Sequence, residues 1–119
     1  MKFTRKATAQ WIGSGKEGKG TLTTQSTVLE NTQYSFKTRF EDGIGTNPEE
    51  LIAAAHAGCF TMQLSFLLGE QGFIPTYLDT EAKLTFEDGN ITHILLTLNG
   101  KIDKINQSTF EVIASKAKE

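Results

Sequence analysis

Cys59 is the only cysteine of the 119-residue chain and its one soft nucleophile. A cysteine reacts as the thiolate, so a reactive one needs its pKa lowered by a helix N-terminus or by a nearby cation. His56, three residues earlier, would share a helix face with it. Free cysteines are, however, among the most buried residues of proteins. From spacing alone, packing roles are therefore favoured for both Cys59 and His56.

Arg39 is the second cation within reach of Cys59 along the sequence, because it ends a predicted strand shortly before the helix that carries the thiol. A guanidinium 4 Å from the thiolate would contribute up to about 4 kcal/mol and lower the thiol pKa by up to about 3 units. The alternative is a solvated charge at a strand end. The residues alone leave both interpretations open.

Several other chemistries lack the residues that they need. His56, His93 and Cys59 have no recognised metal-ligand spacing. A Cys-His-Asn hydrolase needs its cysteine near a helix N-terminus, whereas Cys59 would lie about three turns inside its helix. Residues 13–18 spell G-x-G-x-x-G, but residues 21–28 are rich in β-branched side chains and poor in helix formers. We therefore expect the glycine-rich segment to form a hairpin loop. For the chain as a whole we expect neither a cofactor nor a metal.

The stretch 47–73 around Cys59 is predicted to hold one helix of about 23 residues with its two caps. Asn47 suits the N-cap, a proline follows it at the first helical position, and Glu50 can close a capping box. Gly72 suits the left-handed position after the helix, and Phe73 can fold back on the last turn in a Schellman contact.

This helix has no clean polar face, because residues 51–69 contain no acidic or basic side chain except His56. A helix that is apolar nearly all round is buried. A membrane span is disfavoured, since the run barely reaches spanning length and soluble strands surround it. A chain of 119 residues has little material to cover such a helix. We therefore expect an obligate homodimer.

The remaining pattern predicts one α+β domain over residues 1–119. Residues 41–46 are expected to form a loop, and Asp88-Gly89 a two-residue hairpin turn. Ser108 and Glu111 form a capping box that opens a second helix, with an apolar stripe at Phe110, Ile113, Ala114 and Ala117. The expected strands are Phe3–Trp11, Tyr34–Phe40, Tyr77–Phe86 and Asn90–Ile102, the last of them central or covered on both faces.

Composition sets the expected compartment and partners. The net charge of −2 gives no electrostatic footprint for nucleic acid. The N-terminus lacks the apolar segment of a signal peptide, and a single cysteine excludes an internal disulfide. We expect a cytoplasmic protein without a membrane partner.

The chain resembles the OsmC/Ohr family of thiol-dependent hydroperoxide reductases over almost its whole length. The resemblance implies an OsmC-like fold, with antiparallel sheets around a long buried central helix in an intertwined homodimer. The residues that carry it are Trp11, the Gly-Lys-Gly of 18–20, Phe36 to Glu41, Gly45 to Leu51, Ala54 to Phe60, and Ser108 to Phe110.

The resemblance also implies roles. Cys59 matches the peroxidatic cysteine, Arg39 the arginine that holds its thiolate, and Glu49 the carboxylate that orients the arginine. Glu49 and Cys59 would lie about 15 Å apart along one helix. Either the arginine spans that distance or the partner subunit supplies one of the groups, and we favour the partner.

The implied reaction is the reduction of an organic hydroperoxide to an alcohol through a sulfenic acid on Cys59. Apolar neighbours would favour alkyl or lipid hydroperoxides over hydrogen peroxide. The neighbours proposed for this role are Phe36, Phe40, Phe60 and Met62.

The chain departs from the family in lacking a second cysteine after the second helix, where it reaches Glu119. Turnover is then expected to need an external thiol, for which a dithiol such as a lipoyl group is one candidate. Two alternative functions stay open: a catalytically impaired or non-catalytic dimeric ligand-binding protein with Cys59 as packing, and a redox sensor that uses the sulfenic acid.

Overall fold

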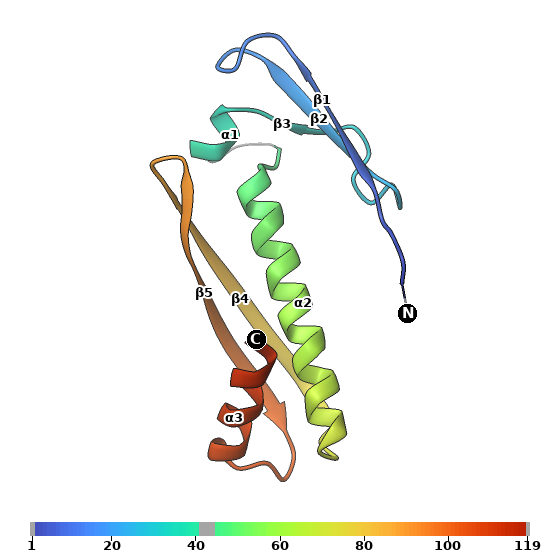
Figure 1. Cartoon of the computed structure of the whole chain (residues 1–119), viewed down its shortest axis with the longest axis vertical. Coiled ribbons are helices and arrows are strands. Elements are labelled where there is room, and N and C mark those ends of the chain that lie inside the picture. The colour runs from blue at the N-terminus through green and yellow to red at the C-terminus, as the bar shows by residue number, and fades with distance from the viewer. Residues whose placement is uncertain (1, 41–44, 119) are drawn as a thin grey trace. The chain divides into compact units, whose positions relative to one another are not determined.

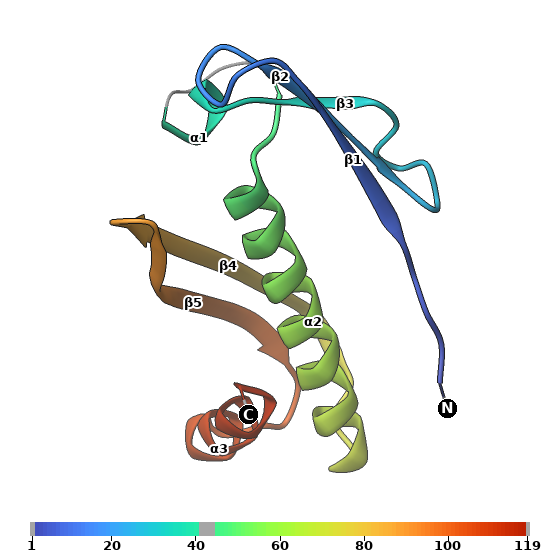
Figure 2. The ribbon, with the colours of Figure 1, turned by 45° about the horizontal axis from the view of Figure 1, so that its top comes forward.

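The computed structural model describes residues 2–40 and 45–118. It forms two compact units, Met1–Leu51 and Ile52–Glu119. Figures 1 and 2 show the labelled elements from two directions. The prediction of a single domain stays a prediction.

The first unit holds a three-stranded antiparallel sheet in the order β1-β2-β3. Its strands are β1 (Ala7–Ile12), β2 (Lys19–Thr24) and β3 (Thr32–Tyr34). The predicted first strand therefore begins four residues later than expected, and it is exposed along its length instead of half-buried. The glycine-rich segment 13–18 joins β1 to β2, which confirms the hairpin loop.

Two aromatic rings cover the glycines of the hairpin. The Trp11 and Tyr34 rings lie 5.4 Å apart, centroid to centroid. A Cβ atom added at Gly20 would come within 2.6 Å of the Trp11 ring and 2.5 Å of the Tyr34 ring. A Cβ atom at Gly18 would come within 2.6 Å of Trp11 Nε1, which donates a hydrogen bond to the Ser14 carbonyl. Only glycine fits beneath these rings.

The predicted strand Tyr34–Phe40 is wrong beyond its first residue. β3 ends at Tyr34, and α1 (Lys37–Phe40) follows. Ser35 and Thr38 cap this turn reciprocally: the Thr38 amide donates to Ser35 Oγ, and the Ser35 amide donates to Thr38 Oγ1. This pairing resembles a capping box, and it stabilises a helical turn where a strand was predicted. Arg39 therefore lies in a helical turn.

The long helix α2 (Pro48–Glu70) begins and ends where the sequence predicts. The Glu50 amide donates to Asn47 Oδ1 at 2.8 Å, which confirms the N-cap. The Phe73 amide donates to the Leu68 carbonyl at 2.9 Å, with the preceding glycine at φ 87°, which confirms the Schellman end.

The second unit contains an antiparallel hairpin of β4 (Pro75–Glu87) and β5 (Asn90–Ile102). Its turn at Asp88-Gly89 has φ values of 52° and 80°, as a type I′ turn requires. Both strands and the turn are confirmed. Within the described residues this sheet has two strands, so β5 is not central, and Ile91 and Leu95 on its outer face are exposed.

Helix α3 (Gln107–Lys118) begins before the predicted capping box. Asn106 is its N-cap, because Asn106 Oδ1 accepts a hydrogen bond from the Thr109 amide at 2.7 Å. The predicted apolar stripe is confirmed: Ile113 is buried, and the other three members of the stripe pack against the core.

The core of the second unit lies between α2, the hairpin and α3 (Figure 1). It is built on Phe60, Leu64 and Leu68 of α2 and on Ile113. The single chain buries one stripe of α2 and leaves much of the helix exposed, as expected of a helix that one chain cannot cover. The prediction that a second subunit buries the helix nearly all round stays a prediction. By length and composition alone α2 could also cross a membrane, a test that core helices of soluble proteins pass as well.

The ring-covered glycines give a stability prediction. Gly20→Ala should destabilise the first unit by about 1–3 kcal/mol, because the new methyl group overlaps two rings. Denaturant unfolding followed by the fluorescence of Trp11, the single tryptophan, measures this. Gly15→Ala is the control, since a Cβ atom there meets no atom within 4 Å. Equal losses in both variants would contradict the prediction.

Candidate functional site

Cys59 is exposed in the described chain and lines an open groove of about 640 Å³. The single chain therefore contradicts the interpretation of Cys59 as a buried packing residue. The groove lies between α2 and the last turn of α3. Its lining residues are Ile52, Ala55, His56, Cys59, Phe60, Gln63, Lys116, Ala117 and Lys118.

The buried stripe of α2 determines where the thiol points. Successive helical residues are rotated by about 100°, because an α-helix has 3.6 residues per turn. Cys59 directly precedes the buried Phe60 and so lies beside the core stripe, on the flank that faces α3. On α3, Ala117 packs against the core, which brings Lys116 and Lys118 to the rim of the same groove.

Arg39 and Glu49 form an ion pair within the first unit. Arg39 Nε donates to Glu49 Oε1 at 2.5 Å, and the two side chains are 32% and 14% exposed. A second bond joins the same segments, because Asn47 Nδ2 donates to the Thr38 carbonyl at 2.8 Å. Asn47 thus ties the α1 turn to the start of α2. Within the single chain, Glu49 therefore binds Arg39.

The two glutamates of the first turn of α2 have different partners. The Glu49 carboxylate accepts a hydrogen bond from Arg39, whereas the Glu50 carboxylate accepts one from the Thr46 hydroxyl at 2.7 Å. Glu50 was expected to bind back to Asn47 in a capping box, and its carboxylate instead holds the residue before the cap. Both carboxylates lie at the helix N-terminus, where the macrodipole favours negative charge.

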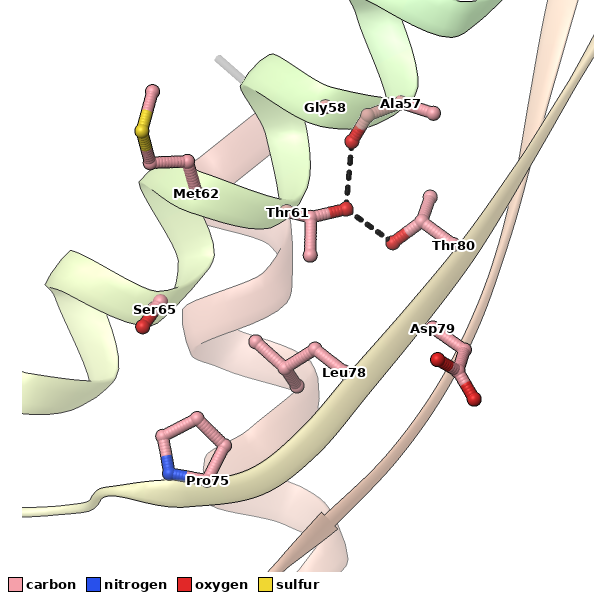
Figure 3. Close-up of a pocket in the computed structure, with 9 residues that line it drawn as sticks. All are labelled: Ala57, Gly58, Thr61, Met62, Ser65, Pro75, Leu78, Asp79 and Thr80. Atoms are coloured by element: carbon pink, nitrogen blue, oxygen red, sulfur yellow. Dashed lines mark hydrogen bonds between the residues drawn. The ribbon is translucent and has the colours of Figure 1, made fainter.

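A second pocket, of about 690 Å³, lies on another flank of α2, against β4 (Figure 3). The Thr61 hydroxyl lies 2.6 Å from both the Ala57 carbonyl and the Thr80 hydroxyl, which links the helix to the strand. Met62 lines this pocket. Cys59 does not, so the pocket is separate from the thiol groove.

The structure brings together some of the predicted site residues. Arg39 meets Glu49 in the first unit, and Cys59 lies with His56 and Phe60 in the second. Of the expected apolar neighbours, Met62 lines the other pocket, Phe36 belongs to the first unit, and the Phe40 side chain lies outside the described residues.

Sequence reasoning missed the lysines of the groove. Lys116 and Lys118 flank Ala117, a member of the predicted apolar stripe, so the pattern placed them beside the packed face of α3. What it lacked was the packing of that face against the flank of α2 that carries the thiol. In the described part of the chain, no group of three or more His, Cys, Asp or Glu side chains is arranged to hold a metal ion.

Comparison with known proteins gives consistent matches. A family model described as OsmC-like protein matches residues 40–119. The chain is 48% identical to peroxiredoxin OsmC of Escherichia coli K12, over 99% of this chain and 85% of that protein.

Solved structures agree on the fold. The organic hydroperoxide resistance protein OhrB of Bacillus subtilis matches with a TM-score of 0.63 and 26% identity, over 97% of this chain and 83% of that one. An organic hydroperoxide resistance protein of Elizabethkingia anophelis matches with a TM-score of 0.69 and 21% identity, over 98% and 82%. The α+β fold with antiparallel sheets and a long helix is confirmed, and the chain belongs to the OsmC family.

Proposed function

We propose that the protein is a thiol peroxidase that reduces organic hydroperoxides to alcohols. The observation that carries the proposal is the exposed thiol of Cys59 in a groove lined by more apolar than polar surface. The groove volume is that of a small-molecule site. The identity to a peroxiredoxin over nearly the whole chain supports the same reaction.

In the proposed reaction, the Cys59 thiolate attacks the distal oxygen of the hydroperoxide. A sulfur–oxygen bond forms as the oxygen–oxygen bond breaks, so the sulfur is oxidised by two electrons to a sulfenic acid. The leaving alkoxide takes a proton and departs as the alcohol. An external thiol then condenses with the sulfenic acid, releasing water, and a second thiol equivalent restores the free cysteine.

Arg39 and Glu49 have supporting roles in this proposal. A guanidinium carries five N–H donors in a fixed plane, which suits it to hold both a thiolate and a peroxide oxygen. Glu49 binds Nε and so fixes the plane of the guanidinium. With Nε bound to the carboxylate, the donors on the two Nη atoms have a set direction. This orientation is the role that we assign to Glu49.

The proposal includes a homodimer. α2 exposes large apolar side chains, with Ile52 at 42%, Met62 at 61% and Phe66 at 67%. The outer face of β5 adds Ile91 at 43% and Leu95 at 53%. So much exposed apolar surface marks an interaction site, and a second copy of the chain would cover it.

The peroxidatic step predicts a defined covalent product. One equivalent of cumene hydroperoxide should add one oxygen atom to Cys59 within seconds, and a dithiol should remove it. Intact-mass spectrometry measures both, and Cys59→Ser is the control that should gain nothing. A folded wild-type protein that keeps its mass would refute the proposal and leave a non-catalytic binding role.

The Arg39–Glu49 pair predicts a larger loss for one glutamate than for its neighbour. Glu49→Gln should slow oxidation of Cys59 about 10- to 100-fold, because a guanidinium displaced by about 1 Å loses its alignment. Glu50→Gln removes the same charge from the same helical turn and should stay close to wild type. Rapid-mixing measurement of thiol loss gives the rates. Similar losses in both variants would point to a general charge effect.

The exposed face of α2 predicts the assembly state. Sedimentation should give the mass of two chains for the wild type. Phe66→Glu should shift the protein towards one chain, because an unpaired charge in an apolar interface is costly. Ser115→Glu, at an exposed position of α3, is the control and should stay dimeric. A monomeric wild type would contradict the proposed dimer.

A further inference from the structure

We propose that Lys116 and Lys118 form an anion-recognising rim of the Cys59 groove and select hydroperoxides that carry a carboxylate. The inference rests on the proposed peroxidase function and adds a specificity to it. The lysines are specificity-determining residues in this proposal, and the thiol performs the same chemistry on charged and neutral substrates.

The charge of the groove differs from that of the chain. The chain has 14 acidic and 12 basic residues and a net charge of −2. Among residues 2–40 and 45–118, those that line the groove include two lysines and one histidine but no aspartate or glutamate. At these described residues an anion would therefore meet positive charge, although the protein as a whole is acidic.

The lysines place the positive charge on the wall of the groove opposite the thiol. Lys116 and Lys118 come from the last turn of α3, whereas the thiol comes from α2 on the other wall. Ala55 and Phe60 supply apolar surface on the thiol wall. A molecule with a hydroperoxide on an alkyl chain and a carboxylate further along matches this lining.

The lysines have a second effect, which the test must separate from recognition. Cations in the last turn of a helix stabilise it through the macrodipole. Such a contribution changes the stability of α3 but is the same for every substrate. Discrimination between an acid and its ester is the measurement that a structural role alone would not change.

The test compares an alkyl hydroperoxide bearing a carboxylate with its methyl ester, both of medium chain length. The readout is the second-order rate of thiol loss at Cys59 in a single turnover, which needs no reductant. The acid-to-ester rate ratio should fall about three- to tenfold in a Lys116→Gln/Lys118→Gln double variant. This range corresponds to about 0.7–1.4 kcal/mol of differential binding. High salt should lower the wild-type ratio as well.

Two further variants make the result specific. Lys83→Gln/Lys101→Gln removes the same charge from exposed positions on β4 and β5 and should keep the wild-type ratio. Lys116→Arg/Lys118→Arg retains the charge and should keep most of it. Circular dichroism checks that each variant is folded.

The outcomes separate this inference from the function on which it rests. If cumene hydroperoxide and the ester oxidise Cys59 but the acid-to-ester ratio is the same in wild type and groove variant, the lysine proposal fails alone. An equal fall in the sheet variant would overturn it too, because the effect would then be one of net charge. If no hydroperoxide oxidises Cys59, both proposals fall.

Discussion

The rotation of α2 about its own axis is fixed by three side chains that it buries, Phe60, Leu64 and Leu68. They face the β4–β5 hairpin and α3, and this packing determines which residues lie on the other faces of the helix. Because successive residues are rotated by about 100°, burying Phe60 turns the preceding cysteine out of the core. The Thr61–Thr80 hydroxyl pair opposes rotation from the other flank. The same packing places one nucleophile and two ammonium groups along one groove.

The parts of the fold that sequence predicts well are those that depend on short-range hydrogen bonds. Both ends of α2 are specified by residues within a few positions of each other: the Asn47 side chain accepts from the Glu50 amide at the start, and the Phe73 amide donates to the Leu68 carbonyl at the end. The errors come from local competition. Alternation over residues 34–40 imitates a strand, but the Ser35–Thr38 pair closes a helical turn instead. At α3 two good caps compete, and Asn106 forms the cap two residues before Ser108.

The candidate site also contains contacts that the sequence alone does not predict. The roles of Arg39 and Glu49 came from resemblance to a family, and the ion pair between them is a contact that spacing alone does not predict. Spacing favoured a buried Cys59, but the thiol is exposed in the described chain. Its exposure depends on how much of the apolar helix the rest of the chain covers, and spacing does not predict that. The lysines of the groove depend on contact between two helices far apart in sequence. Such contacts leave no periodic signal in one sequence.

The contacts of the adjacent glutamates at the start of α2 constrain the number of residues between the N-cap and the first turn of the helix. Glu49 binds Arg39, while Glu50 binds Thr46 through its side chain and the N-cap Asn47 through its amide. Inserting or deleting one residue between the cap and these positions would rotate the carboxylates by about 100°. The cap could then form with either glutamate, but the arginine would face the wrong side chain. Natural variation in this family should therefore change the chemistry of this turn by substitution and leave its length unchanged.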